Sequence, residues 1–446
     1  MKILLLCLFC LLVKLNGFSQ IVAGPMLGQV ELRDARIWIE LTPAVKSIQL
    51  AYLKKGQAKW NSLPYKGVLG GTYNPIQFII ANLEPNTTYQ YRFVIDGKAA
   101  RQTGEFTTKD LWQWRKPAPD FSFLTGSCSY VNEPVYDRHG KPYGGDSSIF
   151  ETMAKEKAAF TLWLGDNWYY REVDFYSASG LQYRAHRDRS QPVLQPLLKA
   201  MPHYAIWDDH DYGPNDADKS FVLKKESREI FKKYWSNPSY GENEEGIYTM
   251  VSYADVDIFM MDDRWFRSSN EMETTIDGKP NGAKSMWGAQ EMEWLKNALL
   301  TSKATFKLIA TGNQTLNLKS SSESLQDYPT EFNELLSFLH LEKINGVLFL
   351  TGDRHHSEVI KYNRAGTYPL YDITNSPLTS GVSKVTGTKE EANPARIPGT
   401  LVEVQNYSRI SVSGPAKQRQ LKVEFLSVKG ERLASWSINE NDLKTP

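Results

Sequence analysis

The pattern of hydrophobic positions changes once along the chain, near residue 110. Between residues 22 and 108 it alternates with a period of two, as in Tyr89, Tyr91 and Phe93, and apolar runs such as "ARIWIEL" and "SIQLAYLKK" are separated by turn residues. Such alternation is typical of half-buried β-strands. We therefore predict an all-β domain over residues 20–108, which the proline-bearing segment "DLWQWRKPAPD" separates from the rest of the chain.

From residue 118 on, short apolar runs alternate with amphipathic segments. The runs have the length of buried strands, and they are "FSFLTG", "FTLWLGD", "HYAIWDD", "DIFMMDD", "FKLIATG" and "GVLFLTGD". The helix candidates are 147–157, 221–235, 286–300 and 329–341, and strand-like runs such as "GTLVEVQ" return over 399–440. This alternation predicts an α/β layer structure over residues 118–446. The polar, turn-rich segment 380–398 is expected to be a mobile loop.

The first 19 residues have the pattern of a signal peptide. Lys2 precedes an apolar stretch that ends at Val13, and small residues stand at Gly17 and Ser19, where a signal peptidase would cleave. We therefore expect a secreted or periplasmic protein, and no later run is long enough to cross a membrane. Cleavage would leave Cys128 as the single cysteine, so this residue is buried and inert, pairs with another chain, or binds a metal.

Composition narrows the possible functions only slightly. The 446 residues include 41% hydrophobic positions, which is ample for a core, and 52 Lys and Arg balance 51 Asp and Glu. This balance gives no reason to expect nucleic acid or an anionic surface as a partner. Nothing in the pattern requires an obligate protein partner.

Polar residues with metal-binding side chains follow five of the apolar runs. They are Cys128 in "LTGSC", Asp166 and Tyr169 in "LGDNWY", Asp208 to Asp211 in "WDDHD", Asn313 and Gln314 in "ATGNQ", and Asp353, His355 and His356 in "TGDRHH". In an open α/β sheet, ligands bind beyond the carboxyl ends of the strands. If these runs form neighbouring strands, all five clusters meet at one edge.

Clustered carboxylates repel one another unless cations neutralise them. Carboxylate, imidazole and amide groups suit divalent or trivalent metals, and a metal pair about 3.5–4 Å apart is the usual machinery for phosphoester cleavage. Taken singly, each residue also has an ordinary explanation: Cys128 as a small buried hydrophobe, Asp166 and Asn313 as turn or cap residues. His355 and His356 point oppositely in an extended segment, so we expect only one of them as a ligand.

The order of these motifs resembles the PhoD-type alkaline phosphatases, which have the wider calcineurin-like metallophosphoesterase fold. "GSC", "LGDNWY", "WDDHD", "MDDRWFR" and "TGDRHHSE" follow one another as in that family. The resemblance implies a four-layer α/β fold, with two packed mixed sheets flanked by helices. The N-terminal part resembles a fibronectin type III or immunoglobulin-like β-sandwich. The family's activity implies an alkaline phosphatase or phosphodiesterase that attacks phosphate esters with a metal-held hydroxide.

The same resemblance implies a ligand set for a centre that contains Fe(III) and Ca(II), with other divalent metals possible. It gives Cys128, Tyr169 and His355 to iron, Asp166 to the bridge, and Asp209, Asn313 and Asp353 to the second metal; Gln314 competes with Asn313, and His356 with His355. A second site rich in oxygen favours a hard ion such as Ca(II) over zinc.

The resemblance also implies residues that contact the substrate, a phosphate monoester or diester. His210 would contact the phosphate or protonate the leaving group. The guanidinium groups of Arg264, Arg267 and Arg354 match phosphate geometry. An ion pair of Arg264 or Arg267 with Asp262 or Asp263 fits the sequence equally well.

Two other functions fit part of the pattern. A purple acid phosphatase-like monoesterase shares the "GDxxY" motif, but those enzymes place a carboxylate where this chain has Cys128. A non-catalytic surface-binding protein would fit the N-terminal domain, and in that case Asp166→Asn would leave the function intact.

Overall fold

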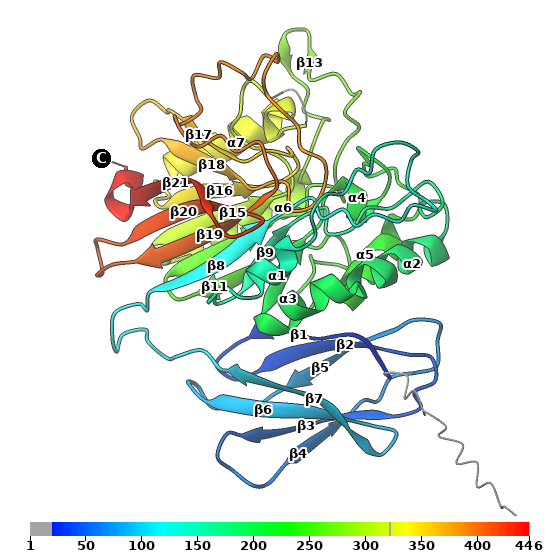
Figure 1. The fold of residues 1–446 in the computed structure, drawn as a ribbon. Helices are drawn as coiled ribbons and strands as arrows, with labels where there is room; N and C mark the ends of the chain where they lie inside the picture. The colour runs from blue at the N-terminus through cyan, green and yellow to red at the C-terminus, as the bar shows by residue number, and fades with distance from the viewer. Residues whose placement is uncertain (1–19, 321–322, 446) are drawn as a thin grey trace, which may run out of the picture.

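A computed structural model describes residues 20–320 and 323–445, and it divides into two bodies (Figure 1). The predicted signal peptide, residues 1–19, lies outside the described residues. A β-sandwich is formed by the chain up to Thr107, and a larger α/β body begins at Phe121. The segment between them contains no helix or strand.

The N-terminal body is a sandwich of two antiparallel sheets. One sheet has the order β1 (Ile21–Val30), β2 (Ala35–Leu41), β5 (Asn74–Ile80), and the other β4 (Asn61–Pro64), β3 (Ile48–Lys54), β6 (Thr88–Ile95), β7 (Lys98–Thr107). Alternate residues of β6 are buried, because successive side chains of a strand point to opposite faces. The predicted all-β domain is thus confirmed, and Tyr89 sits at a corner, where its hydroxyl accepts a hydrogen bond from the Glu84 N–H at 2.9 Å.

The larger body contains two six-stranded mixed sheets. The first has the order β10 (His203–Ile206), β9 (Thr161–Leu164), β8 (Phe121–Gly126), β19 (Asn406–Ser413), β20 (Gln420–Ser427), β21 (Arg432–Asn439), and β8, β9 and β10 run parallel. The second has the order β11 (Thr249–Tyr253), β12 (Val256–Met260), β15 (Phe306–Thr311), β16 (Val347–Thr351), β18 (Leu370–Thr374), β17 (Glu358–Tyr362). Its strands β12, β15, β16 and β18 run parallel.

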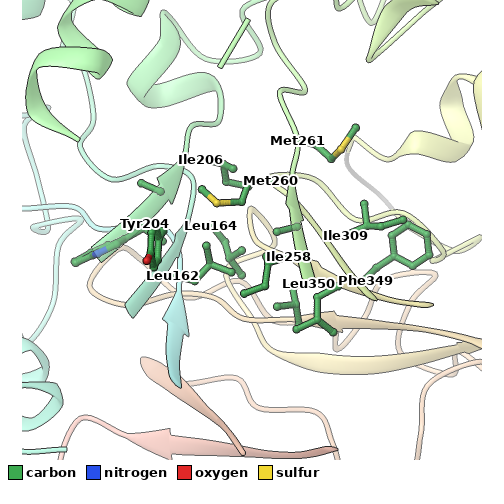
Figure 2. Close-up of a cluster of buried hydrophobic side chains, with 14 of the residues drawn as sticks. Leu162, Leu164, Tyr204, Ile206, Ile258, Met260, Met261, Ile309, Phe349 and Leu350 are labelled. Carbon is green, nitrogen blue, oxygen red and sulfur yellow. The ribbon is translucent and has the colours of Figure 1, made fainter. Parts of the chain in front are cut away.

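Apolar side chains from both sheets meet in one core. Figure 2 shows Leu162 and Leu164 of β9 in the same layer as Ile258 of β12 and Leu350 of β16. These strands are buried on both faces, which is why they read in the sequence as continuous apolar runs rather than alternating ones.

Helices cover the outer faces of the two sheets (Figure 1). The helices of the larger body are α1 (Ile149–Met153), α2 (Ala178–Arg189), α3 (Gln195–Ala200), α4 (Asp209–Tyr212), α5 (Lys224–Tyr234), α6 (Gly288–Thr301) and α7 (Pro329–Leu341), of which the short α4 lies at the carboxyl end of β10. Short elements complete the described chain: the hairpin β13 (Thr275–Ile276) and β14 (Lys279–Pro280), and 3₁₀ turns at Pro192–Leu194, Leu325–Asp327 and Glu440–Leu443. The expected fold of two packed mixed sheets flanked by helices is confirmed.

Two local predictions from the sequence are wrong. The run "GTLVEVQ" forms no strand, because its only ladder contact is an isolated bridge from Val402 to Ser357. Helix α2 was missed because its buried face carries Arg184, Asp188 and Arg189, so apolar periodicity cannot reveal it. Segment 380–398 does lack helices and strands, but Glu390 within it is fully buried in the larger body.

The sandwich and the larger body are joined by specific hydrogen bonds. The Trp38 indole N–H donates to the Lys233 carbonyl at 2.8 Å, and the Gln77 amide donates to the Trp235 carbonyl at 3.1 Å. At Gly28 a Cβ would lie 2.2 Å from the Ser236 Cβ, so this close approach requires glycine. Among the described residues no helix is both long and apolar enough to cross a membrane.

Candidate metal centre

The five polar clusters converge at the carboxyl ends of parallel strands, as the sequence predicted, but they come from both sheets. Cys128, Asp166 and Asp209 follow β8, β9 and β10 of the first sheet, whereas Asn313 and Asp353 follow β15 and β16 of the second. The two sheets touch here, because a Cβ on Gly352 would lie 2.6 Å from the Leu164 carbonyl. The site therefore lies where the edges of the two sheets meet.

One group of ligand atoms comprises Cys128, Asp166 and His355, whose atoms lie within 4.8 Å of one another. The Tyr169 hydroxyl adjoins this group and donates to the Asp166 carboxylate at 2.9 Å. His355 Nδ1 lies 2.6 Å from the Gly381 carbonyl, which can only accept a hydrogen bond. Nδ1 therefore carries the hydrogen, which leaves Nε2 with the lone pair that binds metals.

A second group comprises Asp166, Asp209 and His210, again within 4.8 Å of one another. Asp166 thus belongs to both groups. One Asp166 oxygen accepts from the His210 backbone N–H at 3.2 Å and the other from Tyr169. The ring centres of Tyr169 and His210 lie 4.2 Å apart, so the two groups adjoin each other.

Four of the predicted ligands have left-handed backbone conformations. The φ angles are +60° at Cys128, +53° at Asp166, +65° at Asp353 and +58° at His355. A residue other than glycine in this region costs roughly 1–2 kcal/mol, and such strain concentrates at functional sites. The folded body holds these four residues in place against that cost.

The electrostatics of the site favour a cation. Burial and the neighbouring carboxylate Asp209 raise the pKa of Asp166 well above its usual value. Burial raises the pKa of the Cys128 thiol to about 11 and also raises that of Tyr169. Burial and the nearby acids raise the pKa of Asp353 to about 6, and its Oδ2 is a buried atom with no hydrogen-bond partner in the described part of the chain. Sulfur, phenolate, imidazole and carboxylate donors that repel one another when ionised fit a bound metal pair.

The side chains of Asn313 and Gln314 have different hydrogen-bond partners. Asn313 lies near the second group: its amide donates to Asp208 at 3.2 Å and its oxygen accepts from Arg267 at 2.8 Å. The Gln314 amide donates to Glu358 at 2.9 Å. The structure thus places Asn313 on the side of Asp208 and the arginines. Its role as a ligand stays a prediction.

Arg264 and Arg267 form buried ion pairs, but with different partners from those the sequence suggested. Arg264 contacts Asp208 at 2.5 Å and Glu323 at 2.5 Å, and Arg267 contacts Glu323 at 2.8 Å. Among the described residues, neither arginine forms the alternative ion pair with Asp262 or Asp263: Asp262 accepts from the Trp207 indole and Asp263 from the Asn313 backbone N–H. Both guanidinium groups are fully buried, and Glu323 occupies a position between them.

Arg354 and His356 belong to a separate buried network. Arg354 contacts Glu390 at 2.5 Å, and Arg396 contacts Glu358 at 2.5 Å. His356, Glu358 and Glu390 are close enough to one another to hold a metal ion, yet the two arginines already balance the two carboxylates. We therefore interpret this group as an ion-pair network that anchors segment 380–398. His355, not His356, lies with Cys128 and Asp166.

Two depressions open at the site. One, of about 330 Å³, is lined by Tyr143, Asp209, His210, Asp353 and His355, among others. The other, of about 420 Å³, is lined by Asn270, Lys284, Glu323 and Asp327, and both include Asp216 and Asp353. A third depression, of about 420 Å³, lies between the sandwich and the α/β body, and none of the predicted ligands lines it.

Sequence reasoning missed Tyr143, Asp216 and Glu323. The Tyr143 hydroxyl lies 3.2 Å from His355 Nδ1, and the Asp216 N–H donates to Asp209 at 2.8 Å. All three lie in irregular segments without an adjoining apolar run, which was the signal used to find the others. The one available hint was the Asn-Asp pair at 215–216, shortly after "WDDHD".

Two packed mixed sheets, with acidic, sulfur and imidazole side chains gathered where their edges meet, define a metallophosphoesterase-like fold. Solved structures agree with this class. The structure of PhoD superposes with a TM-score of 0.77 at 18% identity, covering 96% of this chain and 92% of that chain. Purple acid phosphatase PPD1 from yellow lupin (Lupinus luteus) seeds superposes with a TM-score of 0.68 at 11% identity, covering 94% of this chain and 75% of the lupin chain.

The chain belongs to the PhoD-like phosphatase family, whose model matches residues 123–412. A curated relative, alkaline phosphatase D of Bacillus subtilis (strain 168), is 25% identical over 321 residues, which cover 62% of this chain. The match spans 52% of that relative's length, about half.

Proposed function

We propose that the protein is a metal-dependent phosphoesterase that uses a pair of metal ions bridged by Asp166. The observation that carries this proposal is the position of Asp166, which belongs to both ligand groups and shares its two oxygens between them. Membership of the PhoD-like phosphatase family supports the reaction class.

The donor atoms support different metals at the two positions. A thiolate from Cys128, a phenolate from Tyr169 and an imidazole from His355 suit Fe(III) better than a purely oxygen-binding cation. Asp209, Asn313 and Asp353 offer only oxygen, which suits Ca(II). When bound, the metals would act as Lewis acids toward a phosphoryl oxygen and lower the pKa of a bound water.

The residues of the chain then have separate tasks. Asp166 and Asp209 would supply the negative charge that balances the metal cations. The hydrogen bond from His355 Nδ1 to the Gly381 carbonyl holds this imidazole in the tautomer that exposes Nε2. His210 lines the open depression beside these ligands, and burial lowers its pKa, so it stays mostly neutral above pH 7. A neutral imidazole there is suited to orienting a phosphate ester or exchanging a proton with its leaving group.

The arginines have a more indirect role in this proposal than the sequence suggested. Arg264 and Arg354 are buried and bound by Glu323 and Glu390, respectively. They fix the positions of the acidic residues around the pocket. The sequence also suggested that Arg354 contacts the phosphate directly. Arg354 lines the smaller depression, so a structure with a bound phosphate ester would test this prediction.

The central experiment compares metal-loaded and metal-free protein on an aryl phosphate monoester and an aryl phosphate diester. Chelation should abolish hydrolysis, and iron plus calcium should restore it, whereas either metal alone should restore it only in part. Full activity in a preparation shown by metal analysis to lack both would contradict the proposal. The ratio of diester to monoester rates at pH 6 and pH 9 separates an alkaline phosphodiesterase from an acid monoesterase.

Export is a separate part of the proposal. The pattern of residues 1–19 supports a cleaved signal peptide and a secreted or periplasmic enzyme. N-terminal sequencing of protein recovered outside the cytoplasm should begin near Gln20. An uncleaved N-terminus on the exported protein would indicate an anchor instead.

A further inference from the structure

We infer that Arg171 is a positioning residue that holds Tyr169 in the orientation in which its phenol can serve as a metal ligand. The inference rests on the proposed function, because it assigns a role to Tyr169 at the metal centre. Arg171 directly follows the "LGDNWYY" motif, yet it faces neither depression, and it contacts the motif from behind.

The Arg171 guanidinium is almost fully buried and binds three different acceptors. One terminal nitrogen donates to the Tyr169 carbonyl in a short bond, the other donates to the Val131 carbonyl at 3.0 Å, and Nε donates to Asp137 at 2.9 Å. A planar fork with several fixed donors suits this geometry, whereas a lysine ammonium cannot match it. Arg171 thus ties the backbone of the tyrosine to the neighbouring 131–137 segment.

The same guanidinium supports the Tyr169 ring through Tyr130. It lies 3.8 Å from the centre of the Tyr130 ring, whose hydroxyl donates to Asp137 at 2.7 Å. The Tyr130 ring in turn lies 5.1 Å from the Tyr169 ring, and Cys128, Tyr130 and Tyr169 form one buried cluster. The tyrosine is therefore restrained at its backbone and on one face of its ring.

The arrangement is anchored to helix α2. The Arg171 backbone N–H donates to Asp174 at 2.8 Å, and Asp174 accepts from the buried Arg184 of α2 at 2.8 Å. Because a ligand must be held within a fraction of an ångström, groups that fix it contribute strongly to metal affinity and rate. The 2.9 Å contact between the Tyr169 hydroxyl and Asp166 is the geometry that this support preserves.

The test compares Arg171→Met and Arg171→Lys with a matched control, Arg187→Met. The Arg187 guanidinium also binds the 131–137 segment, because it donates to the Val131 carbonyl at 2.9 Å and to the Asn132 carbonyl at 2.6 Å. It does not contact Tyr169. The readout is the visible absorption band that a tyrosinate bound to Fe(III) produces, measured together with iron content. We expect Arg171→Met to shift or abolish the band and to lower kcat by about 10- to 100-fold.

Arg171→Lys should also shift the band, although it keeps the charge, whereas Arg187→Met should leave the band in place. General destabilisation reduces the amount of folded protein but not the band position of the folded fraction. A band at the wild-type position in Arg171→Met that carries full iron would overturn the inference.

A crystal structure of metal-free Arg171→Lys makes the outcome independent of iron. We expect the Tyr169 hydroxyl to move away from Asp166; an unchanged contact would overturn the inference even if the wild-type protein shows no band. Absence of the band from wild-type protein that is active with other metals would instead count against the iron assignment of the proposed function.

Discussion

The two halves of the metal centre are built in different ways. Around Cys128, Asp166 and His355, the ligand atoms face one another, and the supporting bonds come from hydroxyl groups and backbone carbonyls. Around Asp209, Asn313 and Asp353, the neighbours are charged: Arg264, Arg267 and Glu323 form a buried ion-pair network that also binds Asn313.

The difference shows two solutions to the problem of burying acidic groups. In the first half, burial raises the pKa of Cys128 and, together with the neighbouring carboxylate of Asp209, that of Asp166, so these two groups resist ionisation unless a positive charge lies beside them. In the second half, Arg264 and Arg267 neutralise part of the charge and lower the pKa of Glu323, while His210 and Arg264 lower the pKa of Asp209. Arginines therefore balance part of the charge of the second half, whereas the proposed function assigns this task in the first half to a bound metal.

Asp166→Asn should have the largest effect, because it alters the one residue that both halves share. An amide cannot bridge two cations as a carboxylate does, so we expect kcat/KM to fall at least about 1,000-fold, or about 4 kcal/mol. The measurement is hydrolysis of an aryl phosphate together with metal content. Asp277→Asn, on an exposed hairpin, is the matched control and should behave as wild type. Undiminished activity of Asp166→Asn would favour a non-catalytic role for the motif.

Glu323→Gln should remove the central carboxylate of the ion-pair network in the second half and leave the first half unchanged. Removal of its charge leaves Arg267 without its buried carboxylate and costs about 3 kcal/mol of unfolding free energy. Urea unfolding of the metal-free protein measures this cost. Glu334→Gln, which breaks the exposed pair with Lys296, should change stability by less than about 0.5 kcal/mol. If Glu323→Gln instead leaves stability unchanged and lowers KM, the arginines bind phosphate and Glu323 competes with it.

Gly312→Ala should disturb the second half through sterics alone. A Cβ at this position would lie 2.6 Å from the Asp208 carboxyl carbon and 2.8 Å from an Asp263 oxygen. We expect a loss of about 1–3 kcal/mol of unfolding free energy. Gly282→Ala provides the control, since a Cβ there meets open space. Equal stabilities of the two variants in thermal or urea unfolding would show that the carboxylates can shift freely.

The number of protons released on metal binding should differ between the two halves. At pH 8 the Cys128 thiol, with a pKa of about 11, carries a proton that metal binding must displace, whereas Asp353, with a pKa of about 6, is already ionised. Calorimetric titration with Zn(II) in buffers of different ionisation enthalpy counts the protons. Cys128→Ser should release about one proton fewer at pH 8, and Asp353→Asn should do so only near pH 5. An equal count for wild type and Cys128→Ser at pH 8 would show that Cys128 is no ligand.

Much of the site followed from the sequence because strand ends are easy to recognise. Asp166, Asp209 and Asp353 directly follow apolar runs, and parallel strands deliver such residues to one edge. Helices α5, α6 and α7 were found because their apolar faces have helical spacing. Helix α2 was not, because charged residues fill its buried face.

The need for glycine at position 352 also depends on the tertiary structure. In "TGDRHH" the left-handed conformations fall on Asp353 and His355, while Gly352 is required because its backbone touches the Leu164 carbonyl of the other sheet. Its need for a small side chain therefore depends on a contact made only after the two sheets have packed.

The sequence by itself determined the change from an all-β to an α/β pattern, the apolar runs that form β8, β9, β10, β12, β15 and β16, and the chemical character of the polar residues that follow them, since these depend on periodicity and residue type. Only the tertiary structure decided that the ligands come from two sheets, that His355 rather than His356 lies with Cys128, and that Arg264 pairs with Asp208 and Glu323. Partners far apart in the chain are chosen by packing and charge balance in the folded protein, and no local pattern encodes that choice.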